Sequence, residues 1–301
     1  MTASVPPSST GLPSSTENAS STENASSIAI PSASGAPSLT RHRLQLPRDT
    51  DPGDVLTMVR NVRPGAGEDQ DGAIELEDQV RLVPDRSPRG AGRWDLETPR
   101  EREVPLPEGM VDSHGYGRAF PEGMPFGAER RALDLAWSLG RRLYGAVVTD
   151  AGVRLEPHPF QIRDLSVVSA HALAPESLVE LLAPLEPEIA VDDIPEHVVR
   201  SGYSATLPLP AGEEISVRVG LSSRPAALSA LDWLDEAVEY QLVHVTAAPE
   251  EDAVEVPTAE VAERWQHAYR RIGLIAGLLI ESVGGYVVDL EGFLVDPADL
   301  G

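Results

Sequence analysis

The chain has 301 residues, no cysteine and a formal net charge of -24, and all 24 of its basic residues are arginine. Without cysteine it can form no disulfide framework, thiolate metal site or cysteine nucleophile, and without lysine it has no Schiff-base or P-loop lysine. A charge this negative repels phosphate backbones and anionic lipid, so we expect neither nucleic acid nor a membrane surface as a partner.

Residues 1–40 are predicted to form a disordered tail. They are rich in Ser, Thr, Pro and Ala, and the hexad SSTENA occurs twice, at Ser14–Ala19 and Ser20–Ala25. Such a composition buries too little apolar surface to offset the entropy of ordering. The start shows no secretory signal, and the apolar run Ile272–Ile280 is shorter than the ~20 residues that a membrane-spanning helix needs. The sequence therefore predicts a soluble, cytoplasmic protein.

A first α+β unit is predicted at residues 41–163. Alternation of apolar and polar residues indicates strands, and three-to-four spacing indicates helices. The expected elements are a strand at Arg41–Leu46, a helix at Gly53–Val62, strands at Ala73–Val83 and Trp94–Leu106, a loop at Met110–Phe126 and a long helix at Gly127–Leu143.

A second α+β unit is predicted at residues 164–301. The expected elements are a strand at Asp164–Ser169, a helix at Pro175–Ala183, strands at Tyr203–Leu209, Ile215–Val219 and Glu239–Thr246, and a long helix at Thr258–Val283. Thr258 is a favourable N-cap residue and Gly284–Gly285 is a strong helix stop.

The two long helices are followed by similar stretches. Segment 131–157 aligns with segment 271–297 without a gap, and 8 of the 27 positions are identical, where chance would give about two. In both copies the pattern predicts a β-hairpin: Gly145 and Gly285 are expected to adopt a left-handed conformation after the helix, Gly152 and Gly292 to close a type I turn, and Pro157 and Pro297 to end the return strand.

The fold predicted from this repeat is α+β, with two tandem related units. Each unit would be an antiparallel sheet covered by helices, in a ferredoxin-like or similar split β-α-β arrangement. Whether the units pack as one sheet or as two domains is left open.

The C-terminal part of the chain resembles a protein family. The quoted features are the ending GGxVVDxEGFxVDPADL after a long helix and the pattern DLxVxSxxxLxPExLxxLLxP at Asp164–Pro184. They resemble a family of uncharacterised proteins common in GC-rich actinobacteria. The resemblance covers about residues 127–301 and implies no activity, ligand or catalytic residue.

One loop is a candidate ligand or metal site. In VDDIPEH, the side chains of Asp192, Asp193, Glu196 and His197 could bind a divalent ion through oxygen and imidazole ligands. The loop contains a proline, however, and a solvated acidic loop explains it more simply. No cofactor is predicted.

Other polar groups point less clearly to chemistry. In VDSHGYG, Asp112, Ser113 and His114 have the residue types of a catalytic triad but not its frame. Asp289 is expected to serve the second hairpin turn, and the acidic residues near it to face solvent. The Arg-Arg pairs, including Arg141-Arg142, are expected to form local ion pairs on their own helices.

These observations favour a non-catalytic scaffold or partner-binding protein, with another protein as the possible partner. One alternative is a sensor that holds a small ligand between the two related units. Another is a metal-dependent or hydrolytic enzyme that uses VDDIPEH or VDSHGYG. The sequence does not indicate an oligomeric state.

Overall fold

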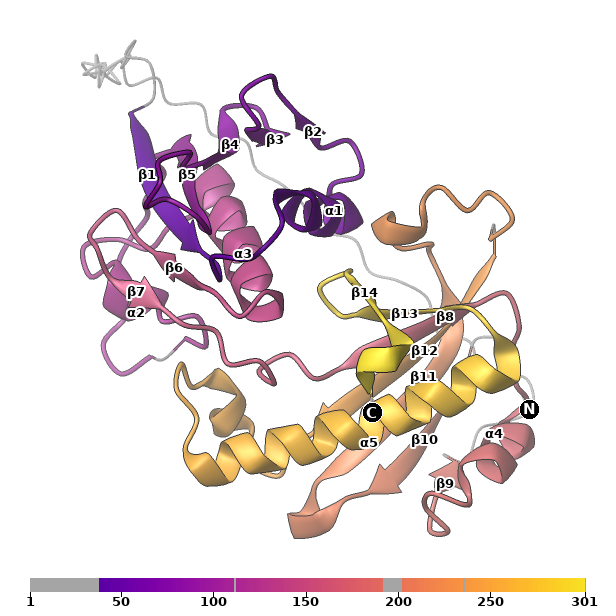
Figure 1. The fold of residues 1–301 in the computed structure, drawn as a ribbon. Coiled ribbons are helices and arrows are strands. Elements are labelled where there is room, and N and C mark those ends of the chain that lie inside the picture. The colour runs from indigo at the N-terminus through magenta and orange to yellow at the C-terminus, as the bar shows by residue number, and fades with distance from the viewer. Residues whose placement is uncertain (1–37, 111, 192–201, 235, 301) are drawn as a thin grey trace, which may run out of the picture. The chain divides into compact units, whose positions relative to one another are not determined.

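In the part of the chain that the structure describes, the strands form two antiparallel sheets of seven strands each (Figure 1). The structure is a computed structural model, and it describes residues 38–110, 112–191, 202–234 and 236–300. Both sheets belong to one compact body, which contains all the described residues. We keep the word unit for the two halves of this body, residues 41–163 and 164–301. The predicted tail at residues 1–40 lies mostly outside the described residues, and the first strand already begins at Leu39.

The first sheet has the strand order β2-β3-β4-β5-β1-β6-β7. Its strands are β1 Leu39–Gln45, β2 Gly67–Glu68, β3 Ile74–Glu77, β4 Val80–Pro84, β5 Arg93–Pro99, β6 Ala146–Val148 and β7 Arg154–Leu155. The helices of this part of the chain are α1 Pro52–Val62, α2 Tyr116–Ala119 and α3 Gly127–Arg142.

The second sheet has the strand order β14-β13-β8-β12-β11-β10-β9. Its strands are β8 Leu165–Ser169, β9 Ala190–Val191, β10 Tyr203–Pro208, β11 Glu214–Ser222, β12 Ala237–Val245, β13 Tyr286–Asp289 and β14 Leu294–Val295. Its helices are α4 Pro175–Leu182 and α5 Ala259–Val283, and Figure 1 shows α5 running along the sheet. A 3-10 helix, Pro297–Leu300, follows β14.

The two sheets have the same topology. Replacing β1 to β7 by β8 to β14, in chain order, turns one strand order into the other, and α1 and α3 correspond to α4 and α5. In the first sheet β1 pairs with both β5 and β6, which are joined through α3, so the sheet contains a split β-α-β arrangement. The second sheet repeats this with β8 between β12 and β13. The α+β class is confirmed; the ferredoxin-like assignment is not.

Pairing registers also agree between the sheets. Leu44 of β1 lies opposite Val147 of β6, and Val167 of β8 lies opposite Val287 of β13. The hairpins match as well, since Val147 pairs with Leu155 and Val287 with Val295. The aligned segments 131–157 and 271–297 therefore correspond residue by residue, with a constant offset of 140.

The first strand and helix of each unit correspond in the same way. Pro52 and Pro175 are the first residues of α1 and α4, a position where proline loses no helical hydrogen bond. One turn and two turns later, Val55 and Val59 of α1 are fully buried, and so are Leu178 and Leu182 of α4. The offset in this part is 123, so the structural correspondence extends beyond the segment in which sequence identity is visible.

Each sheet has its own hydrophobic core beneath its long helix. Trp137 of α3 is buried in the first core, and Ile272 and Ile275 of α5 are buried in the second. The predicted N-cap of α5 is confirmed, because the Thr258 side chain accepts a hydrogen bond from the Val261 amide. Phe293 is an exception, because it follows Gly292 in the second hairpin but is buried in the first core.

The hairpin turns agree with the predicted type I geometry. Gly152 and Gly292 have φ values of 80° and 88°, and each donates its amide hydrogen to the carbonyl of the residue three positions earlier at 2.9 Å. Pro157 and Pro297 follow the return strands β7 and β14, as expected.

The left-handed conformation predicted for Gly145 is wrong, although a glycine is required there for another reason. The left-handed residue after α3 is Tyr144, with φ 54°, whereas after α5 it is Gly284 and Gly285. Glycine is required at 145 and 285 because a neighbouring strand lies very close. A Cβ atom would lie 2.3 Å from the Gln45 carbonyl oxygen in one unit and 2.2 Å from the Val168 carbonyl oxygen in the other.

Some element predictions need correction. The strand expected at 73–83 is two strands, β3 and β4, joined by a tight turn in which Gln79 has φ 60°. The strand expected at 94–106 ends at Pro99, and the expected loop at 110–126 contains the short helix α2. The two-residue strands β2 and β9 were not predicted. None of the described helices has the length and apolar character needed to cross a membrane.

Candidate functional site

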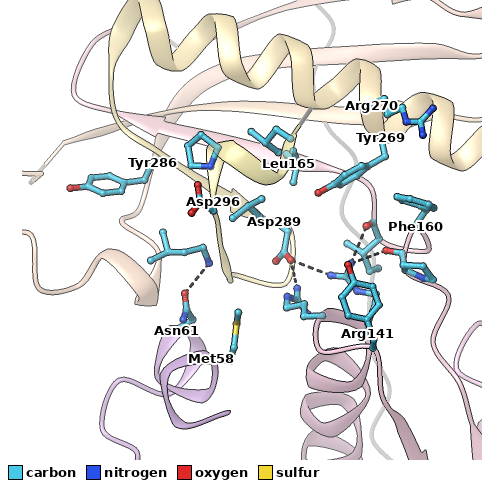
Figure 2. Close-up of a pocket in the computed structure, with 18 of the residues that line it drawn as sticks. Met58, Asn61, Arg141, Phe160, Leu165, Tyr269, Arg270, Tyr286, Asp289 and Asp296 are labelled. Carbon is cyan, nitrogen blue, oxygen red and sulfur yellow. Dashed lines mark hydrogen bonds and ion pairs between the residues drawn. The ribbon is translucent and has the colours of Figure 1, made fainter. Parts of the chain in front are cut away.

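A cleft of about 1020 Å³ lies within the compact body that contains both sheets. One side is formed by α1 and the end of α3, and the other by α5, β13 and β14 (Figure 2). The residues that line it include four aromatic side chains, three arginines and two aspartates: Tyr144, Phe160, Tyr269, Tyr286, Arg141, Arg142, Arg270, Asp289 and Asp296. Helices α1 and α3, the second sheet and the segment that joins the two sheets contribute residues to it.

An ion-pair cluster joins α3 to the second hairpin turn. Arg141 Nη2 lies 3.1 Å from Asp289 Oδ2 and 3.0 Å from Glu291 Oε2. Arg142 pairs with the same two carboxylates, at 2.8 Å for Glu291, and the Ser138 hydroxyl donates to Glu291 at 2.7 Å. Figure 2 shows the Asp289 carboxylate turned toward the arginine side chains. We call Ser138, Arg141, Arg142, Asp289 and Glu291 the interlock.

The interlock is largely withdrawn from water, and its charges stabilise one another. Burial by itself raises the pKa of the Glu291 carboxyl, but the charges of Arg142 and Arg141 and the hydrogen bond from Ser138 outweigh it, so this pKa lies below its ordinary value. Burial lowers the pKa of the Arg142 guanidinium, and the charge of Arg141 lowers it further. Arginine nevertheless stays protonated in proteins, so the cluster keeps its ion pairs at neutral pH.

Phe293 also anchors the turn, next to the interlock. Its ring is 1% exposed, and the Arg142 guanidinium lies over it, 3.7 Å from the ring centroid. A second link comes from α1, where Asn61 Oδ1 accepts a hydrogen bond from the Leu294 amide at 2.8 Å. The hairpin of the second sheet is thus fixed to both α1 and α3 of the first unit.

Arg141 also holds the segment between the two sheets. Its Nη1 donates to the carbonyl oxygens of Pro159 and Ile162, at 3.3 Å and 3.2 Å. The Nε atom of Arg141 is buried without a hydrogen-bond partner. One guanidinium therefore contacts both the acidic turn and the connection.

The rim of the cleft is aromatic and exposed. Tyr144 is 83% exposed, and Tyr286 and Leu294 are 37% and 39% exposed. Phe160 packs against Tyr269, with ring centroids 5.5 Å apart. Exposed aromatic side chains around a concave surface favour contact with another molecule, because they bring large apolar area at a small cost in side-chain entropy.

Two expectations about charged residues are corrected by the interlock. Glu291 does not face solvent, and Arg141 and Arg142 pair with residues about 150 positions away rather than along their own helix. Arg130 does form the expected local pair, with Asp134 at 2.8 Å. A signal for the interlock was present in the repeat alignment, where Arg141 stands opposite Glu281 and Ala151 opposite Glu291.

The candidate metal residues Asp192, Asp193, Glu196 and His197 lie outside the described residues. Within residues 38–110, 112–191, 202–234 and 236–300, there is no group of three or more His, Asp or Glu side chains that could hold a metal ion. The metal-site prediction thus stays a prediction.

Residues 112–117, the described part of the VDSHGYG stretch, form a capped turn. The Asp112 carboxylate accepts hydrogen bonds from the backbone amides of His114, Tyr116 and Gly117, at 3.1, 2.8 and 2.8 Å. His114 packs on the Trp137 ring, with centroids 4.4 Å apart, and burial lowers the pKa of its imidazole. Asp112 is therefore committed to the backbone at the start of α2, whereas a triad would need it to orient the histidine.

Two buried histidines that sequence reasoning did not single out form polar clusters. His42 Nδ1 accepts from the Asp150 amide, so its Nε2 carries the proton that is donated to Glu129 at 2.9 Å. Arg102 completes this cluster with Glu129 and Asp150. Such fully partnered networks specify one packing arrangement.

The second cluster is centred on His244. Its Nδ1 accepts from Arg163 Nε at 2.6 Å, and its Nε2 lies 3.1 Å from Glu213. Arg264 pairs with the same glutamate. Burial lowers the pKa of the His244 imidazole, and the charge of Arg163 lowers it further. Both ring nitrogens are occupied, as they are in His42.

Comparisons with known proteins give no further assignment. A scan against protein-family models, a search of curated proteins and a search of solved structures each found no match. The family resemblance of residues 127–301 therefore stays a prediction.

Proposed function

We propose that this protein is a non-catalytic, partner-binding module built from two copies of one α+β unit, and that the cleft between α1, α3, α5 and β13 holds a segment of the partner protein. The observation on which the proposal depends is the exposed aromatic rim around a cleft to which both copies contribute. Duplication is supported by the common strand order and by the two constant offsets of 140 and 123 residues.

The chemistry of the cleft favours binding over reaction. The charged groups at its base are paired with one another, since Arg141 and Arg142 form ion pairs with Asp289. The groups that remain exposed at the rim, Tyr144 and Tyr286, offer apolar faces with a hydroxyl at one end. Tyrosine is enriched in protein interfaces for this combination. The volume is at the upper end of the ~300–1,000 Å³ typical of small-molecule sites, which suits a peptide segment.

The test is affinity capture with the full chain from its native cells, read by quantitative mass spectrometry. The cleft variant is Tyr144→Asn with Tyr286→Thr. Asn tolerates the left-handed conformation of position 144, and Thr favours the strand conformation of position 286. Loss of two aromatic anchors should cost at least about 2 kcal/mol of binding free energy, or about 30-fold in affinity, so the partner should disappear from the capture.

The matched control is Trp233→Ser. Trp233 is a large aromatic residue that is 60% exposed and does not line the cleft. Its removal should leave capture unchanged. Equal capture by the wild-type chain and the cleft variant, with both folded by circular dichroism, would reject the proposal.

A small-ligand sensor is a second candidate, favoured by the fact that residues of both units enclose one cleft. A ligand bound there would stabilise the folded chain by an amount that grows with the logarithm of the ligand concentration. A thermal-shift screen with amino acids and nucleotides at millimolar concentration tests this. A melting temperature that rises in the wild-type chain and not in the Tyr144→Asn, Tyr286→Thr variant would favour the sensor over the partner-binding module.

A further inference from the structure

The contact between the two units joins different surfaces. Helix α3 of the first unit presents Ser138, Arg141 and Arg142, and the turn of the second hairpin presents Asp289 and Glu291. A contact between two different surfaces of related units is heterologous, and identical units joined in this way can continue to add without limit. A second molecule could therefore add through the two surfaces that this contact leaves free, which are the first hairpin turn and the corresponding face of α5.

The corresponding positions in the other copy lack the charges that form the interlock. With the offset of 140, Arg141 and Arg142 correspond to Glu281 and Ser282 on α5, both of which are exposed. Asp289 and Glu291 correspond to Thr149 and Ala151 in the first hairpin turn. The basic face and the acidic turn are each present in one copy only.

The first hairpin turn is engaged within its own unit instead. Asp150 accepts a hydrogen bond from the Thr40 hydroxyl at 3.0 Å and pairs with Arg102 at 3.2 Å. Its amide donates to His42 Nδ1 at 3.0 Å. This turn thus has no carboxylate to offer to the arginines of another copy.

We propose that these charge differences make the contact between units one-directional, so that the chain joins two units and excludes further copies of itself. An acidic turn of a second molecule would meet Glu281 rather than Arg141, with like charges opposed. A first hairpin turn of a second molecule would bring Thr149 and Ala151 to a basic face already filled by Asp289 and Glu291. The proposal rests on the duplication given under the proposed function, but not on partner binding in the cleft.

The experiment restores the missing charges on two separate full-length chains. One chain has Glu281→Arg with Ser282→Arg, which copies the basic face onto α5. The other has Thr149→Asp with Ala151→Glu, which copies the acidic turn onto the first hairpin. In the second hairpin Asp289 Oδ1 accepts from the Phe293 amide at 3.1 Å, so an aspartate suits this turn position.

Sedimentation velocity measures the average mass of each chain alone and of the mixture. Tethered sites have effective concentrations in the millimolar range, so the mixture is followed up to about 1 mM. We expect wild type and each variant alone to keep one mass at all concentrations, and the mixture to gain mass as concentration rises. The gain should vanish when Glu281→Gln with Ser282→Gln replaces the basic chain.

Two results would overturn the proposal. One is a mixture of folded chains whose average mass stays constant up to the highest concentration. The other is a wild-type chain that assembles and loses assembly on Asp289→Asn. None of the four positions changed in the mixing experiment lines the cleft, so this result is independent of any result on partner capture.

Discussion

The two hairpin turns have the same backbone and different surroundings. In each, the first turn residue accepts the amide of the glycine three positions later at 2.9 Å, and the strand registers are the same. Yet the turn that begins at Thr149 contacts its own unit through Asp150, whereas the turn that begins at Asp289 contacts the other unit through Glu291 and Phe293. Backbone requirements set the turn, and two or three side chains decide what it binds.

The largest difference between the turns should appear on truncation of the residues that follow their closing glycines. Phe293→Ala removes a ring buried in the first core together with its contact to Arg142, and should lower the free energy of unfolding by about 3–5 kcal/mol. Its counterpart Val153 is only partly buried, so Val153→Ala should cost about 1 kcal/mol or less. Urea denaturation of both variants measures this. Equal losses would contradict the view that only the second turn anchors the units together.

Removing one arginine should destabilise either the interlock or the cluster around His42, depending on which arginine is replaced. Arg142→Gln leaves Asp289 and Glu291 with Arg141 alone, and should cost about 2–3 kcal/mol. Arg102→Gln, in the cluster of the first turn, should cost a similar amount.

Hydrogen exchange distinguishes these two variants. Arg142→Gln should speed exchange of the Gly292 amide, and Arg102→Gln should leave that amide unchanged. Faster exchange at Gly292 in both variants would mean that the two clusters are not independent.

The glycines before the hairpins should respond alike. Gly145→Ala and Gly285→Ala each force a Cβ atom against a strand carbonyl, and each should cost about 1–3 kcal/mol. Gly277→Ala on α5 is the control, because its Cβ meets nothing within 4 Å, and it should stabilise the helix by about 1 kcal/mol. Thermal unfolding followed by circular dichroism measures all three. A neutral Gly145→Ala would show that the two units differ at this position after all.

The smallest expected effect is a pH dependence of the interlock. The pKa of Glu291 is lower in the folded chain than its ordinary value of 4.5, so this group contributes stability above that pH and loses the contribution as pH falls through the folded pKa. The difference in unfolding free energy between wild type and Glu291→Gln should shrink by about 1 kcal/mol between neutral pH and about pH 3.5. A difference that stays constant over this range would rule out the ion pairs as its source.

Local signals in the sequence predicted much of each unit. The helical spacing of α3 and α5, the Thr258 cap and the hairpin glycines are short-range features, and the structure confirms them. The turn at Gln79 was missed because a residue with no special preference for a left-handed conformation occupies it. The helix α2 was missed because it depends on Asp112, whose carboxylate caps the Tyr116 amide from outside the helix.

The cleft could not be predicted from local patterns. Its base pairs Arg141 with Asp289, 148 positions apart, and its rim combines Tyr144 with Tyr286. Neither pair has a spacing rule, because tertiary packing brings them together. The usable clue was the charge contrast between the aligned copies, at positions 141 and 281 and at positions 151 and 291.

The two sets of contacts that Arg141 makes restrict how the two sheets can move. Its guanidinium is bonded at once to the Pro159 and Ile162 carbonyls of the connection and to the carboxylates of the acidic turn. A rotation about that connection would disturb both sets of contacts, because the same guanidinium makes them. We therefore expect the two sheets to move apart only when Arg141 loses its contacts with the connection and with the turn.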